Sequence, residues 1–206
     1  MVSGSLARPE IGEDDLAAFG DWLALIMIAS QARNAGYPIS TTEARTALRS
    51  AGARVLSTVA HRLAIELEAI EPGEKPAFWH NVIGPVFEAI WPLDAELQSP
   101  RATFKLVQIL LATGDAFPHA ADVIIPFIRP EDPRQHTSIY SLSSAGDDLY
   151  LSSPGKMLDL AAAIVGDAST QGIYGLADVL NRIRQRAPHL VNTRKFQRLA
   201  SLAGAN

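Results

Sequence analysis

Apolar residues recur at intervals of three and four along most of the chain, and this spacing is typical of amphipathic helices. The clearest case is residues 53–70, where Pro72 and Gly73 follow the end of the pattern. Polar residues occupy the other side of this segment. The apolar residues share one helix face and are predicted to point into a core: Val55, Leu56, Val59, Leu63, Leu67 and Ile70.

The same spacing predicts a helix over residues 14–34, which is apolar on all sides in its middle and is therefore expected to lie centrally. Its longest apolar run, residues 23–29, is shorter than the roughly 20 residues that cross a membrane, so we expect no membrane association. Further helices are predicted over residues 42–51, 75–91, 100–113, 118–128, 154–165 and 170–186, with a short one after residue 192.

Serine residues predict where several helices begin. Ser40 and Glu43 have the spacing of a capping box, in which each side chain accepts a hydrogen bond from the backbone of the other. Ser99 and Ser153 are each followed by a proline. A serine cap followed by a proline at the first helical position is a preferred way to start a helix, so we expect both serines to cap.

Residues 75–91 are the most aromatic part of the chain. Their helical spacing favours a packed core, although a face left exposed would indicate a partner interface. Pro85 lacks a backbone N–H and predicts a kink near residues 81–84. Gly52 either breaks its helix or only weakens it.

Two segments divide the pattern. Residues 129–135 hold two prolines and predict a loop, which is the best candidate for a boundary between subdomains at residues 1–128 and 136–206, unless the chain is one continuous domain. Residues 139–151 are consistent with either a short hairpin or two short helices.

The chain as a whole predicts an all-α fold of about eight or nine helices. They are expected to form an array of antiparallel pairs, loosely similar to HEAT or armadillo proteins.

Composition excludes several kinds of site. The 206 residues include no cysteine, which rules out disulfides, thiolate nucleophiles and cysteine-ligated metals. The first residues lack the pattern of a signal peptide, so we expect a cytoplasmic protein. The five histidines show no HExxH spacing. Ser153 and Lys156 have an S-x-x-K spacing, but the companion motifs of those acyl-transfer enzymes are missing. We therefore expect no enzyme, no metal and no cofactor.

Charge is unevenly distributed along the chain. Residues 1–180 contain twelve basic and twenty-two acidic residues, a net charge of −10, whereas the segment 181–206 carries +6. These cations either oppose helix dipoles and pair with acids of the same fold, or contact nucleic-acid phosphates or an acidic partner. The candidate binding residues are Arg182, Arg184, Arg186, Arg194, Lys195 and Arg198.

Four stretches carry a resemblance to a known domain: WPLDAEL (91–97), TFKLVQ (103–108), AADVIIPF (120–127) and TSIYS (137–141). Over about residues 75–200 the chain resembles a bacterial domain of unknown function at the C-terminal end of large proteins. Some of those proteins carry sirtuin-like NAD-consuming domains and are linked to phage defence. The resemblance implies an accessory helical module and transfers no functional residue.

Two hypotheses of function follow from these observations. The first is a non-catalytic helical module that binds a protein partner as an accessory part of a larger bacterial protein. The second is a nucleic-acid-associated domain, which would require the basic C-terminal residues to lie on one open face.

Overall fold

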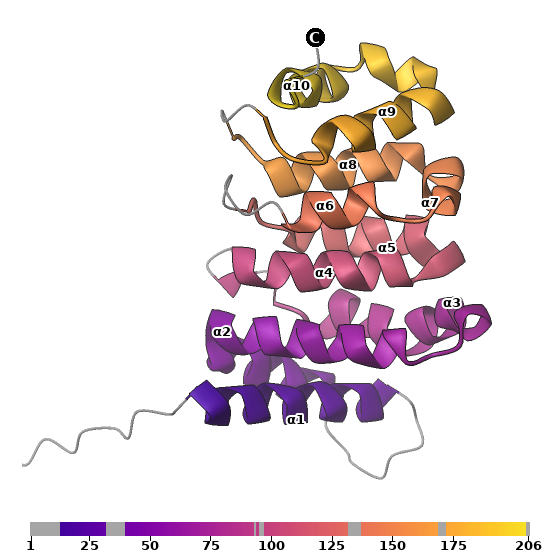
Figure 1. The fold of residues 1–206 in the computed structure, drawn as a ribbon. Helices are drawn as coiled ribbons and strands as arrows, with labels where there is room; N and C mark the ends of the chain where they lie inside the picture. The colour runs from indigo at the N-terminus through magenta and orange to yellow at the C-terminus, as the bar shows by residue number, and fades with distance from the viewer. Residues whose placement is uncertain are drawn as a thin grey trace, which may run out of the picture.

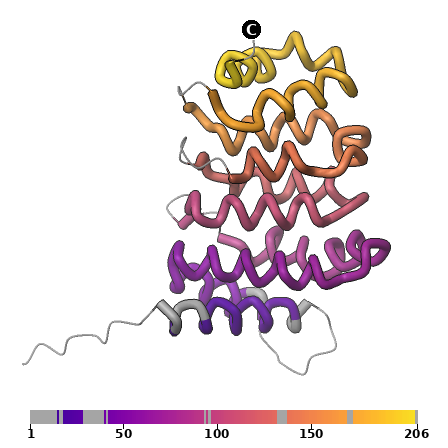
Figure 2. The backbone as a smooth tube through the Cα atoms, in the orientation of Figure 1, coloured from indigo at the N-terminus to yellow at the C-terminus, as the bar shows by residue number. Residues whose placement is uncertain are grey.

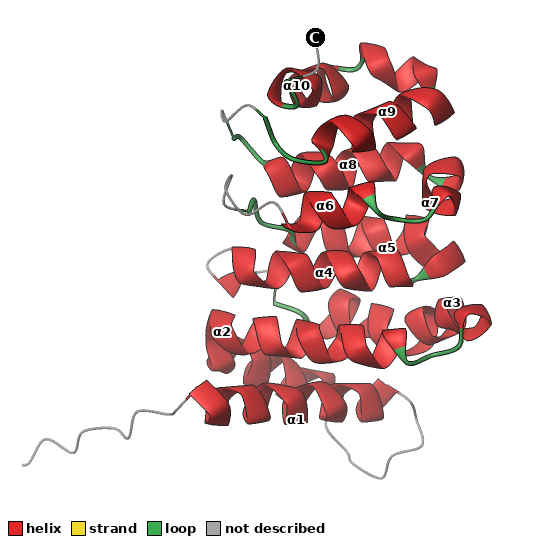
Figure 3. Cartoon of the chain, in the orientation of Figure 1, coloured by secondary structure: helices red, strands yellow, loops and turns green. Residues whose placement is uncertain are grey.

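The computed structural model describes residues 13–31, 40–92, 94, 97–131, 137–168 and 172–204. Within these ranges all regular elements are helices and none is a strand (Figure 3). The prediction of an all-helical array is therefore confirmed. The described residues form ten α-helices, slightly more than expected, because very short helices such as α3 (Lys75–Phe78) and α7 (Asp147–Ser152) give no clear sequence pattern.

The helices stack in chain order from one end of the molecule to the other (Figures 1 and 2). In one row α1 packs on α2, α2 on α4, α4 on α6 and α6 on α9. In a second row η3 contacts α5, α5 contacts α8, and α8 contacts α10. The first row consists of α1 (Glu13–Gln31), α2 (Thr41–Glu68), α4 (Pro100–Ala112), α6 (Thr137–Ser143) and α9 (Leu176–Arg186). The second consists of η3 (Val86–Ile90), α5 (Phe117–Ile124), α8 (Pro154–Val165) and α10 (Arg194–Leu202).

Helices of the same row begin at similar intervals along the chain. In the first row α4, α6 and α9 start at Pro100, Thr137 and Leu176. In the second row α5, α8 and α10 start at Phe117, Pro154 and Arg194. Successive starts are separated by similar but unequal lengths of chain in both rows.

Two of the three predicted serine caps form as expected. The hydroxyl of Ser40 accepts from the N–H of Glu43 at 3.2 Å, and Glu43 accepts from the N–H of Ser40 at 2.9 Å, which completes the capping box. The hydroxyl of Ser99 accepts from Arg101 N–H at 3.2 Å. Ser153 stands at the N-cap of α8, but its side chain makes no capping bond. Its ψ of 54° is far from the extended value of a capping serine, because it follows α7 directly.

Proline and glycine residues shape the helices much as predicted. Gly52 has φ 78° and interrupts the helical backbone inside α2. Around Pro85 the chain widens into two π-helical segments, η2 (Trp79–Ile83) and η3. Wider turns accommodate a residue that cannot donate within the helix, so they are the local response to the predicted kink.

The uncertain segments are resolved as helices. Residues 139–151 form most of α6 and α7, so the hairpin alternative is wrong. The helix expected from residue 170 begins at Leu176, because Gly172 and Gly175 have φ of 78° and 79° and cannot continue a helix. Residue 170 itself lies outside the described part of the chain. Before α10 the chain forms a short 3-10 helix, η7 (Pro188–Asn192).

Buried residues from α1 to α10 form one hydrophobic cluster. The predicted aromatic core is confirmed, since Trp79, Phe87 and Trp91 are all buried. Helices on both sides of residues 129–135 contact one another, and buried Glu131 accepts from the backbone of Ser138 at 3.1 Å. The division into two subdomains at this loop stays a prediction. Among the described helices none is long and apolar enough to cross a membrane.

Candidate functional site

Arg182 is the most firmly held of the predicted basic residues. Its guanidinium donates to the carbonyl oxygens of Ser143 at 2.9 Å and Ala145 at 2.7 Å, and lies 2.6 Å from a carboxylate oxygen of Asp147. It also stacks 3.9 Å from the ring centre of Tyr150. Burial raises the pKa of the Tyr150 hydroxyl, and the nearby Arg182 opposes that rise. Arg182 therefore joins α9 to the α6–α7 turn and does not face an open surface.

Most of the other predicted cations also contact their own chain. Lys195 forms an ion pair with Asp159 of α8. Arg198 donates to the carbonyl of Gly166. The guanidinium of Arg184 lies 5.9 Å from the ring of Phe196.

The two remaining cations differ from each other. Arg186 lies 3.8 Å from Asp147, and Arg194 is exposed at the start of α10. Five of the six predicted residues thus contact groups of the same fold. These contacts favour the structural interpretation of the basic C-terminal segment, and binding of nucleic acid by it stays a prediction.

The residues considered for catalysis are occupied by structural contacts. Lys156 forms an ion pair with Asp122, and Ser153 is buried at the start of α8. No group of three or more histidine, aspartate or glutamate side chains among the described residues could hold a metal ion.

His119 has a structural partner that sequence reasoning missed. The indole N–H of buried Trp79 donates to Nδ1 of His119 at 3.1 Å, and Nε2 of His119 lies 3.4 Å from Glu88. A buried indole donor needs an acceptor, and His119 supplies it. Trp79 and His119 are far apart in the chain, so no local spacing could indicate this contact.

The outer face of α1 exposes three large apolar side chains. Phe19, Trp22 and Leu25 are 40%, 55% and 44% exposed, and the rings of Phe19 and Trp22 stack with their centres 6.0 Å apart. The inner face of the helix, which includes Leu23 and Met27, is buried against the array. We call Phe19, Trp22 and Leu25 the α1 stripe.

The position of α1 corrects a sequence prediction. A helix that is apolar on all sides was expected in the centre of the fold, but α1 lies at one end of the stack (Figure 1). None of the other described helices of the first row packs on its outer face, which carries the exposed α1 stripe. The opposite end is different, because the exposed residues of α10 include Arg194, Lys195 and Ser201. A polar outer face is what a terminal helix of an array normally shows.

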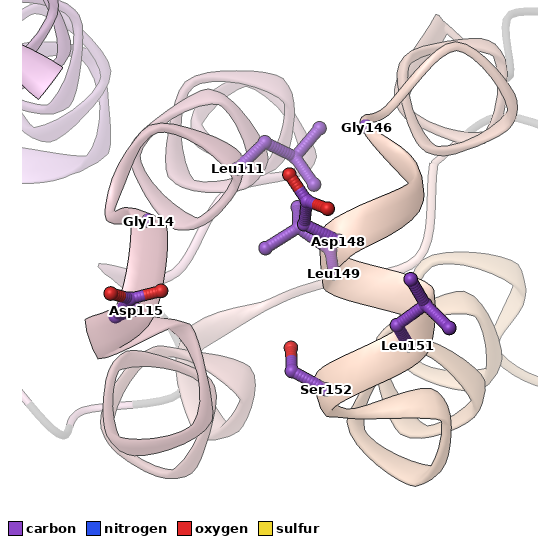
Figure 4. Close-up of a pocket in the computed structure, with 8 residues that line it drawn as sticks. All are labelled: Leu111, Gly114, Asp115, Gly146, Asp148, Leu149, Leu151 and Ser152. Carbon is purple, nitrogen blue, oxygen red and sulfur yellow. The ribbon is translucent and has the colours of Figure 1, made fainter.

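A second candidate surface lies between the end of α4 and α7. A cavity of about 630 Å³ opens there, with Leu111, Gly114 and Asp115 on one side. Figure 4 shows Asp148 and Ser152 on the opposite side, carried by α7. No sequence motif marks this cavity, because its walls come from two segments that are distant in the chain.

A smaller hollow of about 390 Å³ adjoins the first, and both are lined by Leu111. It lies between the end of α2, marked by Glu68, and the exposed side of α6, which carries Tyr140. Tyr140 is 53% exposed, and its ring stacks on that of Tyr174 with the centres 6.1 Å apart. We call the two adjoining hollows the α4–α7 groove.

Comparison with known proteins identifies an uncharacterized relative. No protein-family model and no solved structure matches the chain. The chain is 27% identical over 165 residues to the uncharacterized protein y4cA of Sinorhizobium fredii (strain NBRC 101917 / NGR234). The aligned part is 80% of this chain but 14% of the relative, so the chain spans only a small part of the relative's length.

Proposed function

We propose that this protein is a non-catalytic helical module that binds a protein partner through the α1 stripe. The observation that carries the proposal is the exposure of Trp22, at 55%, beside Phe19 and Leu25 on a terminal helix. Contiguous apolar patches on soluble proteins mark interaction sites, and aromatic residues contribute most to interface energies. As in the sequence analysis, we expect the complex to form in the cytoplasm.

A helix of the partner, laid along α1, would fit this surface best. The inner helices of the first row each pack between two neighbours, whereas α1 has a neighbour on its α2 side alone among the described elements of that row. A helix with its own apolar stripe would bury the α1 stripe and extend the stack by the same packing.

The length of the relative supports an accessory role. The segment of y4cA that aligns with this chain makes up 14% of that protein. The aligned segment is therefore a small part of a much longer protein. We propose that this module likewise works within a larger bacterial protein or complex. A link to sirtuin-like domains and phage defence stays a prediction of the resemblance over residues 75–200.

Affinity purification from cells that encode the protein tests the proposal. The tagged wild type is compared with a Phe19→Ser, Trp22→Ser double variant, and an Ile65→Ser variant serves as the matched control. Ile65 is 41% exposed on α2 and lies outside the α1 stripe. Quantitative mass spectrometry should show a protein that the double variant loses at least about tenfold and the control keeps. Equal recovery of every copurifying protein with all three forms would contradict the proposal.

A further inference from the structure

The α4–α7 groove has an apolar floor. Leu111 lies where the two hollows meet, with Ala112 on the same wall and Leu149 and Leu151 on the α7 wall. Leu151 is 55% exposed, so its side chain offers apolar area to a ligand rather than to the core. A pocket of this kind favours a ligand that carries an apolar side chain.

The rim of the groove is acidic. Glu68, Asp115 and Asp148 line the hollows and are exposed, and none of them forms an ion pair within the described residues. No lysine, arginine or histidine is among the described residues that line either hollow. The rim therefore presents carboxylates that are free to pair with a cationic ligand.

Two cations near the groove are engaged within the chain. The ammonium of Lys105 donates to the amide oxygen of Gln108, a lining residue, at 3.1 Å. Arg182 is held by Asp147 and by the carbonyl of Ala145. The bonds of Arg182 hold the α6–α7 turn, which forms one wall of the groove, in place without a ligand.

An aromatic pair stands at the other end of the groove from Asp115. Tyr140 and Tyr174 are 53% and 76% exposed, and Tyr140 lines the smaller hollow together with Glu68. An aromatic ring beside a carboxylate binds the side chain of arginine or lysine through cation–π and ionic contacts together.

We propose that the α4–α7 groove binds a basic peptide segment of a protein. One cationic side chain of the peptide lies between Tyr140 and Glu68, and a second pairs with Asp115 or Asp148. An apolar side chain between them rests on Leu111. This site is separate from the α1 stripe and its occupancy does not depend on the partner bound there.

A peptide array tests the proposal with the purified full chain. The array presents short peptides in which two arginines or lysines flank one leucine or phenylalanine at every short spacing, and a matched set has glutamate in place of the basic residues. Some members of the basic set should bind at least about tenfold more tightly than their acidic counterparts, and binding should weaken as salt rises.

Variants locate the binding on the protein. An Asp115→Asn, Asp148→Asn double variant should lose about fivefold in affinity for the best peptide, since both carboxylates that can pair with its second cationic side chain are removed. Tyr140→Ala should lose a similar factor, while Asp148→Glu should bind like the wild type. Glu74→Gln, which removes an exposed carboxylate of η1 (Pro72–Glu74) outside the groove, is the matched control.

Three results would overturn the proposal. They are equal binding of basic and acidic peptides, an unchanged affinity in the Asp115→Asn, Asp148→Asn variant, and binding of the polyamine spermidine as tight as that of the best peptide. A Trp22→Ser variant should bind the peptide normally, so failure at this groove and failure at the α1 stripe are distinguishable.

Discussion

Glu43 shows how one side chain links helix geometry to pH. Its carboxylate accepts from the backbone N–H of Ser40 at 2.9 Å and from the Ser40 hydroxyl at 2.7 Å. These hydrogen bonds, the backbone one first, hold the pKa of Glu43 below its ordinary value of 4.5. Because the pKa is lower in the folded chain, the charged carboxylate stabilises the fold above pH 4.5, and this contribution is lost as pH falls through the lower folded value.

A Glu43→Gln variant tests this contribution. Wild type should be more stable than the variant at neutral pH, and the difference should shrink as the pH is lowered below about 4.5, because the carboxylate then becomes protonated. Urea midpoints measured across this range give the comparison. Glu74→Gln, whose side chain makes no hydrogen bond in the described structure, should show no such narrowing. A difference that is constant with pH would contradict the role of the charge.

The contacts of a single residue could be predicted from the sequence where its partner is close in the chain. Ser40 and Glu43 lie within one helical turn, and their bonds follow from helix geometry alone. Ser153 misled the prediction because the end of the preceding helix sets its backbone. The partners of Arg182 belong to the distant α6–α7 segment, so composition alone left open whether this cation pairs within the fold or contacts a partner.

At the scale of elements, Gly166 joins three parts of the array. It follows the last residue of α8 with φ 56°, and its carbonyl accepts a hydrogen bond from Arg198 of α10. Pro130, in the loop after η6 (Ile125–Phe127), packs directly against it. A side-chain carbon at this position would lie 2.2 Å from a ring carbon of Pro130. The close approach of the loop and the positive φ both require glycine here.

Gly166→Ala should therefore destabilise the protein by about 2–4 kcal/mol. Gly155→Ala is the matched control in the same helix, since an added carbon there meets nothing within 4 Å. It should be neutral or stabilise by up to about 1 kcal/mol, because alanine favours the helix. Urea unfolding followed by circular dichroism measures both. Equal stability of the two variants would show that the contact of Pro130 with Gly166 is not tight in solution.

Helices were predicted well where apolar residues recur over several turns and a start or stop signal marks one end, as in the second half of α2 and in α4. The prediction failed where glycine geometry decides, because the positive φ of Gly172 and Gly175 delays the start of α9. It stayed open at α6 and α7, since helices as short as these show too few turns to establish a period.

At the scale of the whole molecule, the two ends of the array differ. The α10 end is polar and basic, whereas α1 exposes Trp22 and Phe19. Apolar periodicity identified α1 as a helix but not its place in the stack, because exposed and buried apolar faces look alike in sequence. The α4–α7 groove was not predictable either, since Leu111, Asp148 and Glu68 come from three separate helices.

Photo-crosslinking in the cells that encode the protein tests the central claim most directly. A photoreactive amino acid replaces Trp22 in the α1 stripe or, in a matched variant, the similarly exposed Ile65 of α2. We predict a discrete protein adduct from position 22 that position 65 does not give, because a partner covers the α1 stripe. Absence of any adduct at position 22, or the same adducts from both positions, would contradict the account.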